Sequence, residues 1–556
     1  MKLELKSQVG WVCAVAASAF PFAVCVSAQE LPPLQAQEAS VPRDLPASGA
    51  VQPDGEAAND PLAPIMTLGE ALDRAYSSNP NLLAERARLE AINFRLPQAR
   101  SRSGPNIELE ARYGYRRENY QQATGEYQPQ STWSPAASAV LSQPLFTFGR
   151  NAASERSAAA QIDYQRAVLR VTEQQVMLQA VTAYVSVRRE REAVRIAREN
   201  LSLLERELLD NSMRLKVRDT TRTDVQQVAT RLEIGRAQLL QAQGALSTAE
   251  AEFLKVIGAP PGELAAPDDL TSPTQSLEDA LTLAQQINPV LTAAHARERS
   301  SRAQIEGAKA DRRPRVDLRG RAGVDTNLFG SDPLRQTSLR GEVVLSGPLF
   351  QSGATGARIN EAEAANDADW RLIDDVLRDT RAQVTGSWNE WLTASASVQN
   401  LSRAVYLAEQ AYNGAVQQKR VGMRTTLDVL DLARDLLSAR VSFNQAGASA
   451  VVAKARLLSA IGMLDRAHLT PGLTGYDVET NYKKTRDYSD VPLITPALQK
   501  LDGLMLSPAK ERPSRDPSVG LPTLPLPVEP LSQPDPENLE MDFDAYLQRE
   551  TSSITR

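Results

Sequence analysis

The chain has 556 residues and a formal net charge of -6, with 42% apolar and 5% aromatic residues. No surplus of basic residues exists to neutralise phosphates, so we expect no nucleic-acid partner. Histidine occurs only at His295 and His468, and cysteine only at Cys13 and Cys25. Because zinc sites, cysteine nucleophiles and Ser-His-Asp triads need these side chains, the composition predicts a protein that is not an enzyme and holds no metal or cofactor.

The first 28 residues have the pattern of a secretory signal peptide. Two lysines precede an apolar stretch over 11–26, and a run of small residues ends at Ala28. An uncleaved anchor helix is the alternative, and lipidation at Cys25 is disfavoured because the bulky Val24 precedes it. Cleavage after Ala28 leaves a mature chain without cysteine that works outside the cytoplasm.

Proline divides the chain into helical and flexible parts. Residues 29–66 and 471–556 are rich in proline and lack periodic apolar residues, so we predict a flexible linker and a largely disordered C-terminal tail. No proline occurs in the 115 residues after Pro144 or in the 122 residues after Pro348. Spans of this length, rich in alanine, leucine, glutamine, glutamate and arginine, predict very long helices.

The middle of the chain is an internal duplication, with copies at 67–262 and 276–470 and a linker at 263–275. The offset between matching motifs is 209 residues in the first part of each copy and 204 residues in the second part. The matched pairs are Asn79-Pro80 with Asn288-Pro289, Pro144-Leu145-Phe146 with Pro348-Leu349-Phe350, and Asp224-Val225 with Asp428-Val429. Both copies are therefore predicted to share one architecture, with a shortened loop in the second.

Each copy contains segments in which apolar and charged residues alternate. The apolar members are Ile107, Leu109, Tyr113 and Tyr115 in the first copy and Val316, Leu318, Ala322 and Val324 in the second. This period of two is typical of strands in outer-membrane barrels, and equally of an antiparallel sheet with one face in water. Alternation alone leaves both interpretations open.

The helices favour the barrel. A helix over 151–216 would be about 100 Å long, and Leu201, Leu204, Leu208 and Leu215 have the spacing of a coiled-coil seam. Four strands cannot close a barrel, and lipid does not tolerate an open sheet edge. We therefore predict a mixed fold: a long antiparallel α-helical coiled-coil tunnel, and a transmembrane β-barrel completed by trimerisation with four strands from each protomer.

Polar residues gather at the turn that follows each long helix. Thr223 with Gln226, and Thr425 with Asp428, have the spacing of a capping box for the returning helix. Gly422 suits the left-handed residue that ends a helix. Capping by itself is a sufficient explanation for the threonines.

Asp431 exceeds what capping requires, because it lies three residues after Asp428 and hence on the same helix face. In a symmetric trimer the two residues would form stacked carboxylate rings, which favour cations. Arg424 could reach a carboxylate on a neighbouring helix and hold this end closed. The first copy has Thr220 and Gln227 at the positions of Arg424 and Asp431, so the second copy is the better candidate for gating.

These motifs resemble TolC-type outer-membrane export channels. The resemblance covers roughly residues 67–490 and rests on the paired Asn-Pro and Pro-Leu-Phe motifs and on the two turns. In addition, Tyr476-Asp477, Asn481-Tyr482 and Arg486-Asp487 resemble the ending of the type I secretion branch. The resemblance implies a homotrimer in the outer membrane, in contact with its lipid, with a helical tunnel in the periplasm. It also implies two partners, a periplasmic adaptor (membrane fusion) protein and an inner-membrane transporter.

The resemblance further implies roles for individual residues. These are Thr223, Asp224 and Arg424 for the periplasmic gate, and Asp428 and Asp431 for the carboxylate constriction. The sequence departs from the family at Lys419, where an aromatic gate residue is expected three residues before Gly422. We therefore count Lys419 among the gate residues and expect charge to hold the gate.

A passive duct that exports proteins or small molecules, by type I secretion or tripartite efflux, is the function that we expect. The alternative is a periplasmic coiled-coil adaptor or structural protein that never enters a membrane. A helical hairpin and a water-facing sheet would satisfy that alternative, but it needs neither a second copy nor an alternating charged face.

Overall fold

The two long proline-free spans form the longest helices of the structure. This computed structural model describes residues 64–121, 125–267, 270, 276–329, 332–465, 476–486, 488 and 494–504. Each span folds as a helix of 67 residues followed by a helix of 36 residues. The predicted signal peptide, nearly all of the linker over 29–66 and most of the predicted tail lie outside the described residues.

Each copy of the duplication contributes helices, two strands and a helical hairpin, in that order. The first copy consists of α1 (Leu68–Ser78), α2 (Pro80–Asn93), α3 (Arg95–Ser101), β1 (Asn106–Gln121), β2 (Tyr127–Phe146), α4 (Arg150–Lys216) and α5 (Arg222–Ile257). The second consists of α6 (Leu277–Ile287), α7 (Pro289–Ala310), β3 (Arg315–Phe329), β4 (Asp332–Ser346), α8 (Ala354–Arg420) and α9 (Thr426–Ile461). The matching order confirms the predicted mixed fold of two repeats.

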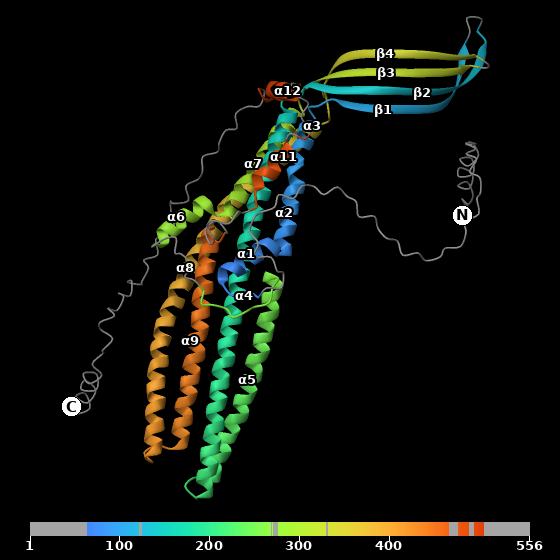
Figure 1. Cartoon of the computed structure of the whole chain (residues 1–556). Coiled ribbons are helices and arrows are strands. Elements are labelled where there is room, and N and C mark those ends of the chain that lie inside the picture. Colours follow the sequence, from blue (N-terminus) through green and yellow to red (C-terminus); the bar gives the residue numbers. More distant parts are fainter. Residues whose placement is uncertain are drawn as a thin grey trace, which may run out of the picture. The chain divides into compact units, whose positions relative to one another are not determined.

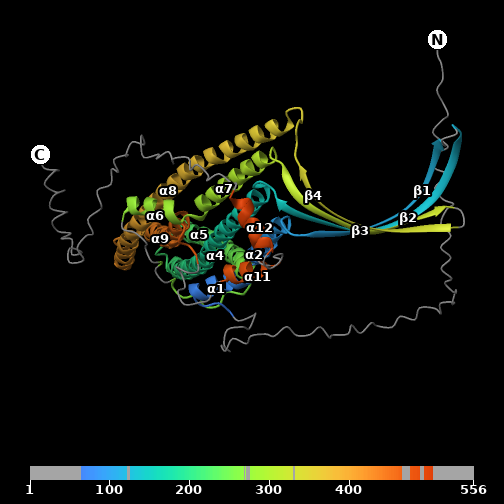
Figure 2. The same ribbon diagram turned by 90° about the horizontal axis from the view of Figure 1, so that it is seen from above.

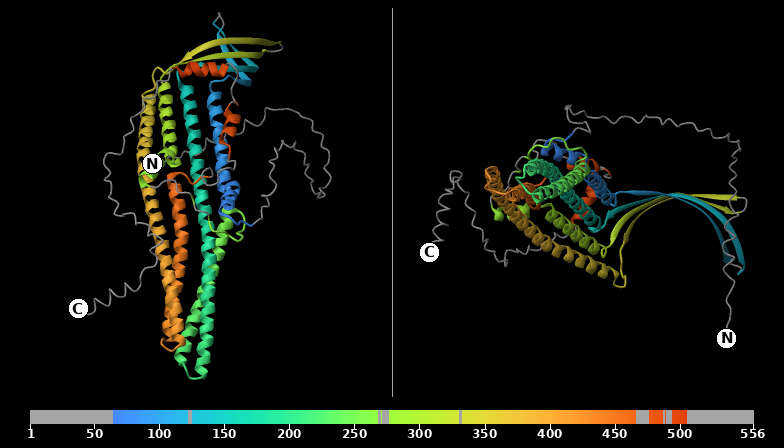
Figure 3. Two further views of the ribbon diagram at one scale, coloured as in Figure 1. Left: turned by 60° about the vertical axis from the view of Figure 1, so that its left-hand side comes forward. Right: turned by 90° about the horizontal axis from the view of Figure 1, so that it is seen from below.

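The two helical hairpins lie alongside each other with their turns at the same end (Figures 1 and 3). Helix α4 packs against α5, α8 packs against α9, and contacts between α4 and α9 join the hairpins. Small buried residues such as Ala153, Ala180 and Ala455 let the helices approach closely. Within the described ranges, no helix combines the length and the apolar character needed to cross a membrane.

The duplicated Asn-Pro motif attaches a helix that precedes the strands of each copy to the returning helix of the same copy. The side-chain oxygen of Asn79 accepts a hydrogen bond from the backbone N–H of Asn81 (3.0 Å) and so caps α2. Its amide group donates to the carbonyl oxygen of Val256 (3.0 Å) in the last turn of α5. Asn288 caps α7 in the same way and donates to Ala460 of α9 (2.8 Å). One side chain thus both starts a helix and holds it to the end of the hairpin.

The four strands form one antiparallel sheet in the order β1-β2-β3-β4, and the sheet is curved (Figure 2). Its register places Ile107 opposite Leu141, and Leu318 opposite Val343. Leu109, Leu339 and other apolar residues are exposed on this face of the sheet. On the other face the alternate residues of β1 and β3 are mostly charged, and Arg321 of β3 pairs there with Glu110 of β1 (3.4 Å). The predicted alternation is therefore confirmed.

Two further helices, α11 (Val478–Arg486) and α12 (Ile494–Gly503), fall inside the segment that the composition assigned to the tail. Helix α11 packs against α2 and α3. The guanidinium of Arg166 in α4 lies 4.6 Å from the ring centre of Tyr482 and 3.3 Å from Glu479. Both short helices lie within the predicted tail segment, and their contacts with the rest of the chain stabilise them.

Helix α12 places a carboxylate at the start of α4. Gly149, the N-cap residue of α4, has no side chain with which to cap the helix. Asp502 is 5% exposed and accepts hydrogen bonds from the backbone N–H groups of Thr147 (2.8 Å), Gly149 (3.0 Å) and Ala152 (3.3 Å). It also accepts one from the hydroxyl of Thr147 (2.8 Å). Helix α8 likewise starts after a glycine, Gly353, that provides no side-chain cap.

Candidate functional site

The turn between α4 and α5 and the turn between α8 and α9 are built on the same capping box. Thr425 accepts a hydrogen bond from the backbone N–H of Asp428 (3.2 Å), whose carboxylate accepts one from the N–H of Thr425 (3.0 Å). This confirms the predicted pair in the second copy. In the first copy the pair is Thr221 with Asp224, and the predicted pair of Thr223 with Gln226 is wrong.

The duplication explains this correction. An offset of 204 residues matches Thr425 with Thr221, and Asp428 with Asp224, so the cap begins two residues earlier than predicted. Thr223 is instead exposed in the first turn of α5. Hydrogen bonds from the side chain and backbone of Thr221, and from Thr220, hold the pKa of Asp224 below its usual value. The same donors of Thr425, together with the charge of Arg424, lower the pKa of Asp428.

Both long helices end on a left-handed residue. Gly422 has φ +77° and donates its N–H to the carbonyl oxygen of Lys419 (3.0 Å), as the sequence predicts. The matching residue of the first copy is Arg218, which adopts φ +61° although it is not glycine. Such a conformation costs a residue with a side chain about 1 kcal/mol. The geometry of the turn is therefore retained in both copies, but only the second has the residue that suits it.

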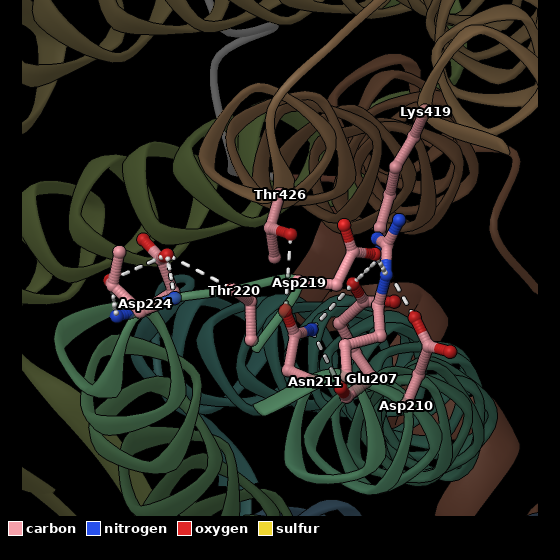
Figure 4. Close-up of polar contacts among 10 residues, drawn as sticks. Glu207, Asp210, Asn211, Asp219, Thr220, Asp224, Lys419 and Thr426 are labelled. Carbon is pink, nitrogen blue, oxygen red and sulfur yellow. Dashed lines mark hydrogen bonds and ion pairs between the residues drawn. The ribbon is translucent and has the colours of Figure 1, made fainter. Parts of the chain in front are cut away.

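Lys419 joins the two hairpins. It lies in the last turn of α8, is only 8% exposed, and forms ion pairs with Glu207 and, at 3.4 Å, with Asp210 of α4 (Figure 4). A lysine in this environment is stable because two carboxylates compensate the loss of water around its charge. Lys419 therefore forms ion pairs at the position where the family resemblance implies an aromatic residue.

Asn211 forms a second link next to Lys419. It is fully buried, and its amide group donates to the backbone oxygen (2.8 Å) and the carboxylate (3.0 Å) of Glu207. Its side-chain oxygen accepts a hydrogen bond from the hydroxyl of Thr426 in α9 (3.1 Å; Figure 4). Both polar atoms of the Asn211 side chain are therefore hydrogen-bonded, and the bond from Thr426 crosses the boundary between the hairpins.

A third link connects α5 with α9. Arg231 donates to the carboxylate of Asp431 (2.8 Å) and to the carbonyl oxygen of Leu430 (3.1 Å). An apolar cluster packs beside it and contains Leu204, Val228, Leu232 and Leu430. We call the three links the inter-hairpin contact; it consists of Glu207, Asp210, Asn211 and Arg231 from the first hairpin and Lys419, Thr426 and Asp431 from the second.

The predicted gate residues are only partly brought together. Arg424 hydrogen-bonds to Gln418 (2.9 Å) in its own turn and contacts neither Thr223 nor Asp224 in this chain. Asp428 is engaged in its cap, whereas the carboxylate of Asp431 is already paired with Arg231. Within the described residues, no group of three or more histidine, cysteine or acidic side chains is placed to hold a metal ion.

The first-hairpin members of the inter-hairpin contact were not predicted from the sequence. One signal was present, because Leu204, Leu208 and Leu215 leave a vacant seam position three residues after Leu208, and Asn211 occupies it. A polar residue at a seam position commonly fixes the register between helices. Glu207 and Asp210 have no such signal, since charged residues occur throughout the exposed faces of α4.

Comparison with known proteins identifies the family. The model of the outer membrane efflux protein family matches residues 71–259 and 280–463, one segment for each copy. The chain is 27% identical over 431 residues to the outer membrane efflux protein BepC of Brucella suis, covering 76% of this chain and 91% of that one. It is 24% identical to the outer membrane protein TolC of Escherichia coli, covering 73% and 84% of the two chains.

Solved structures show the same fold. The outer membrane protein VceC of Vibrio cholerae aligns with a TM-score of 0.62 and 20% identity, over 71% of this chain and 96% of that one. The MtrE outer membrane channel of Neisseria gonorrhoeae aligns with a TM-score of 0.60 and 20% identity, over 72% and 90% of the chains. These findings decide against the alternative of an adaptor that never enters a membrane. The chain belongs to the outer membrane efflux protein family and is an export channel of the outer membrane.

Proposed function

We propose that three copies of this chain close their sheets into a barrel of twelve strands and form a passive duct without catalysis or cofactor. The edge strands β1 and β4 of the single chain are available for pairing with neighbouring copies. Lipid requires such closure, because unpaired backbone groups are not tolerated in it. The apolar face of the sheet would then contact outer-membrane lipid, and the charged face would line the passage.

The exported material is proposed to be polypeptide, delivered by type I secretion machinery. Among relatives, the alkaline protease secretion protein AprF of Pseudomonas aeruginosa is 25% identical over 340 residues, covering 59% of this chain and 70% of that one. The contacts that α11 makes with α2, α3 and α4 give a structural role to the motif over 476–486 that resembles the secretion branch. The partners would be a periplasmic adaptor and an inner-membrane transporter, which provides the energy. The same duct would serve tripartite efflux.

The inter-hairpin contact is the observation that supports a gate at the periplasmic end of the duct. It lies at the turn end of both hairpins, and its central members Asn211 and Lys419 are buried. While Lys419 remains paired with Glu207 and Asp210, α8 cannot move away from α4 without exposing unpaired charges, which is costly. We therefore propose that this contact holds the periplasmic end narrow, and that Thr223, Asp224 and Arg424 meet neighbouring copies in the trimer.

Single-channel conductance of the purified protein in planar bilayers tests the duct and the gate together. The wild type should give a small, long-lived conductance, and Lys419→Met should raise it about threefold or more, because Glu207 and Asp210 then repel each other. Arg420→Met is a matched control, since Arg420 is the exposed neighbouring cation. Replacing Glu207 as well, by Gln, should return Lys419→Met toward wild-type conductance. If the protein does not insert into bilayers, the proposed duct is wrong. If it inserts but Lys419→Met has the conductance of the wild type, only the proposed gate is wrong.

The carboxylate rings remain a prediction, which the structure sharpens. Asp428 is partly exposed and held in its cap, whereas Arg231 neutralises the charge of Asp431 in this conformation. We expect Asp428→Ala to weaken block by a trivalent cation about tenfold or more, and Asp431→Ala to weaken it less. The measurement is the concentration of hexamminecobalt that halves the current. Equal block in the wild type and in both variants would place the cation site elsewhere.

A further inference from the structure

An arginine-lined groove lies at the other end of the hairpins from the gate, where α4 and the strands begin. Helices α3, α4 and α7 enclose a volume of about 560 Å³. Arg95 and Arg102 reach it from α3 and the residue that follows, and Arg150 reaches it from the first turn of α4. Its floor includes Ala153 and Ala303, whose small side chains leave the space open. We call this feature the arginine groove.

The positive charge of the groove is only partly compensated. Arg150 pairs with Asp311 of α7, with 2.7 Å between Nε and Oδ1. The partners of the other two are neutral: Arg95 donates to the amide oxygen of Gln161, and Arg102 to the hydroxyl of Ser154 (3.2 Å). Hydrogen bonds to neutral groups do not cancel a guanidinium charge, so the groove presents two uncompensated cations to a ligand.

The fold itself does not require these arginines. The duplication matches Arg95 with Gln304 and Arg102 with Asp311 at an offset of 209, and Arg150 with Ala354 at an offset of 204. The second copy adopts the same architecture without any of the three cations. The architecture therefore forms without these charges, which leaves Arg95 and Arg102 available to bind a ligand.

The groove opens on a face of α4 that α11 leaves uncovered. Its residues on α4, which include Arg150, Ser154 and Gln161, follow one helical stripe. Helix α11 contacts a different face of α4 through Arg166. The arginine groove and α11 therefore lie on different faces of α4.

From these observations we infer that the arginine groove binds carboxylates of acidic segments in the exported polypeptide. The planar guanidinium of arginine matches a carboxylate and can form two parallel hydrogen bonds with it. A volume of this size accommodates several side chains. Because the groove is open on one side, a bound carboxylate keeps part of its hydration, and binding is weak enough for the chain to move on. This inference rests on the proposed function and names the substrate class of the same duct.

Titration calorimetry with a ten-residue polyglutamate peptide tests the inference on the purified full-length channel. Arg95→Gln combined with Arg102→Gln should weaken binding roughly tenfold or more. The matched control removes two exposed arginines outside the groove, Arg156→Gln with Arg403→Gln, and should leave binding within about twofold. A polyglutamine peptide of equal length should bind neither protein. Equal losses in the groove variant and the control would overturn the inference.

Two further measurements separate the remaining outcomes. In planar bilayers the polyglutamate peptide should reduce the current of the wild type and not that of the groove variant. Peptide binding without any effect on current would place the groove outside the passage and overturn its role in export. Displacement of the peptide by inorganic phosphate at equal concentration would show a general anion site and likewise overturn it. The wild-type conductance without peptide tests the duct itself, so failure of the duct and failure of the groove are distinguishable.

Discussion

The two copies of the duplication are alike along their length and different at their ends. Both have a long helix of 67 residues and a returning helix of 36 residues, and both turns use a threonine–aspartate capping box. At the turn end, however, Lys419 matches Leu215 of the other copy, and Asn211 matches Ala415. At the strand end, α4 receives the carboxylate of Asp502, whereas the glycine before α8 provides no side-chain cap.

This difference shows how one duplicated architecture can bind its own second copy specifically. If the first copy had the residues of the second, the matching Ala411 and Gly414 would replace Glu207 and Asp210, and Lys419 could form no ion pair with α4. Because acids are confined to α4 and the matching base to α8, the contact exists in only one arrangement. Backbone geometry therefore comes from the shared pattern, and specificity comes from the few positions that diverged.

The largest change in stability should come from removing the Asp502 cap, which α4 has and α8 lacks. Asp502→Ala removes the acceptor for three backbone N–H groups and a hydroxyl at a buried helix start. We expect the free energy of unfolding to fall by about 2 to 3 kcal/mol. The check is thermal unfolding of the detergent-purified protein, followed by circular dichroism.

The control is Lys500→Ala, which removes an exposed charge from the same helix without touching the cap. It should leave stability within about 0.5 kcal/mol. Asp502→Asn keeps one acceptor and should fall between the two. If Asp502→Ala and Lys500→Ala were equally stable, α12 would lie on α4 without stabilising it.

Much of this fold follows from the sequence. The duplicated Asn-Pro and Pro-Leu-Phe motifs, the absence of proline and the alternating strands predict each element in order, because local patterns set the period of helix and strand. Helices α11 and α12 could not be predicted, since their contacts come from residues hundreds of positions away. Asp502, for example, contacts Thr147.

The site was less predictable than the fold. Caps and the glycine turn depend on neighbours in sequence, so Thr425, Asp428 and Gly422 could be assigned from spacing. The partners of Lys419 depend on how the hairpins pack, and no local pattern distinguishes Glu207 and Asp210 from other acids on α4. Asp431 was correctly placed on the face of Asp428, but its pairing with Arg231 of another helix could not be foreseen.

A smaller effect should come from exchanging the left-handed residues of the two turns. Gly422→Ala meets no atom within 4 Å, so its cost is that of the backbone alone, about 1 kcal/mol. Arg218→Gly should relieve the corresponding strain in the first copy and stabilise the protein by about 0.5 kcal/mol, since a more flexible unfolded chain offsets part of the gain. Denaturant midpoints measure both. If Arg218→Gly destabilised the protein, the side chain of Arg218 would contribute more to stability than its left-handed backbone costs.

The smallest effect concerns the pH dependence of the two caps. Hydrogen bonds lower the folded-state pKa of Asp224 and of Asp428 below the unfolded value of about 3.9. Each cap therefore contributes fully above that pH and is lost as the pH falls through the lower folded pKa. The causes differ, because Thr220 adds a hydrogen bond to Asp224 whereas Arg424 adds a charge beside Asp428.

Salt should separate these two causes. High salt screens a charge near an exposed carboxylate but leaves a hydrogen bond nearly unchanged. Hydrogen exchange of each turn, corrected for intrinsic rates and followed from pH 5 downward, should show that salt shifts the loss of the second cap to higher pH. The first cap should not move with salt, and Thr220→Val should shift it upward instead. If Arg424→Gln removed none of the salt dependence at Asp428, the arginine would be oriented toward Gln418 alone, and the two turns would be electrostatically equivalent.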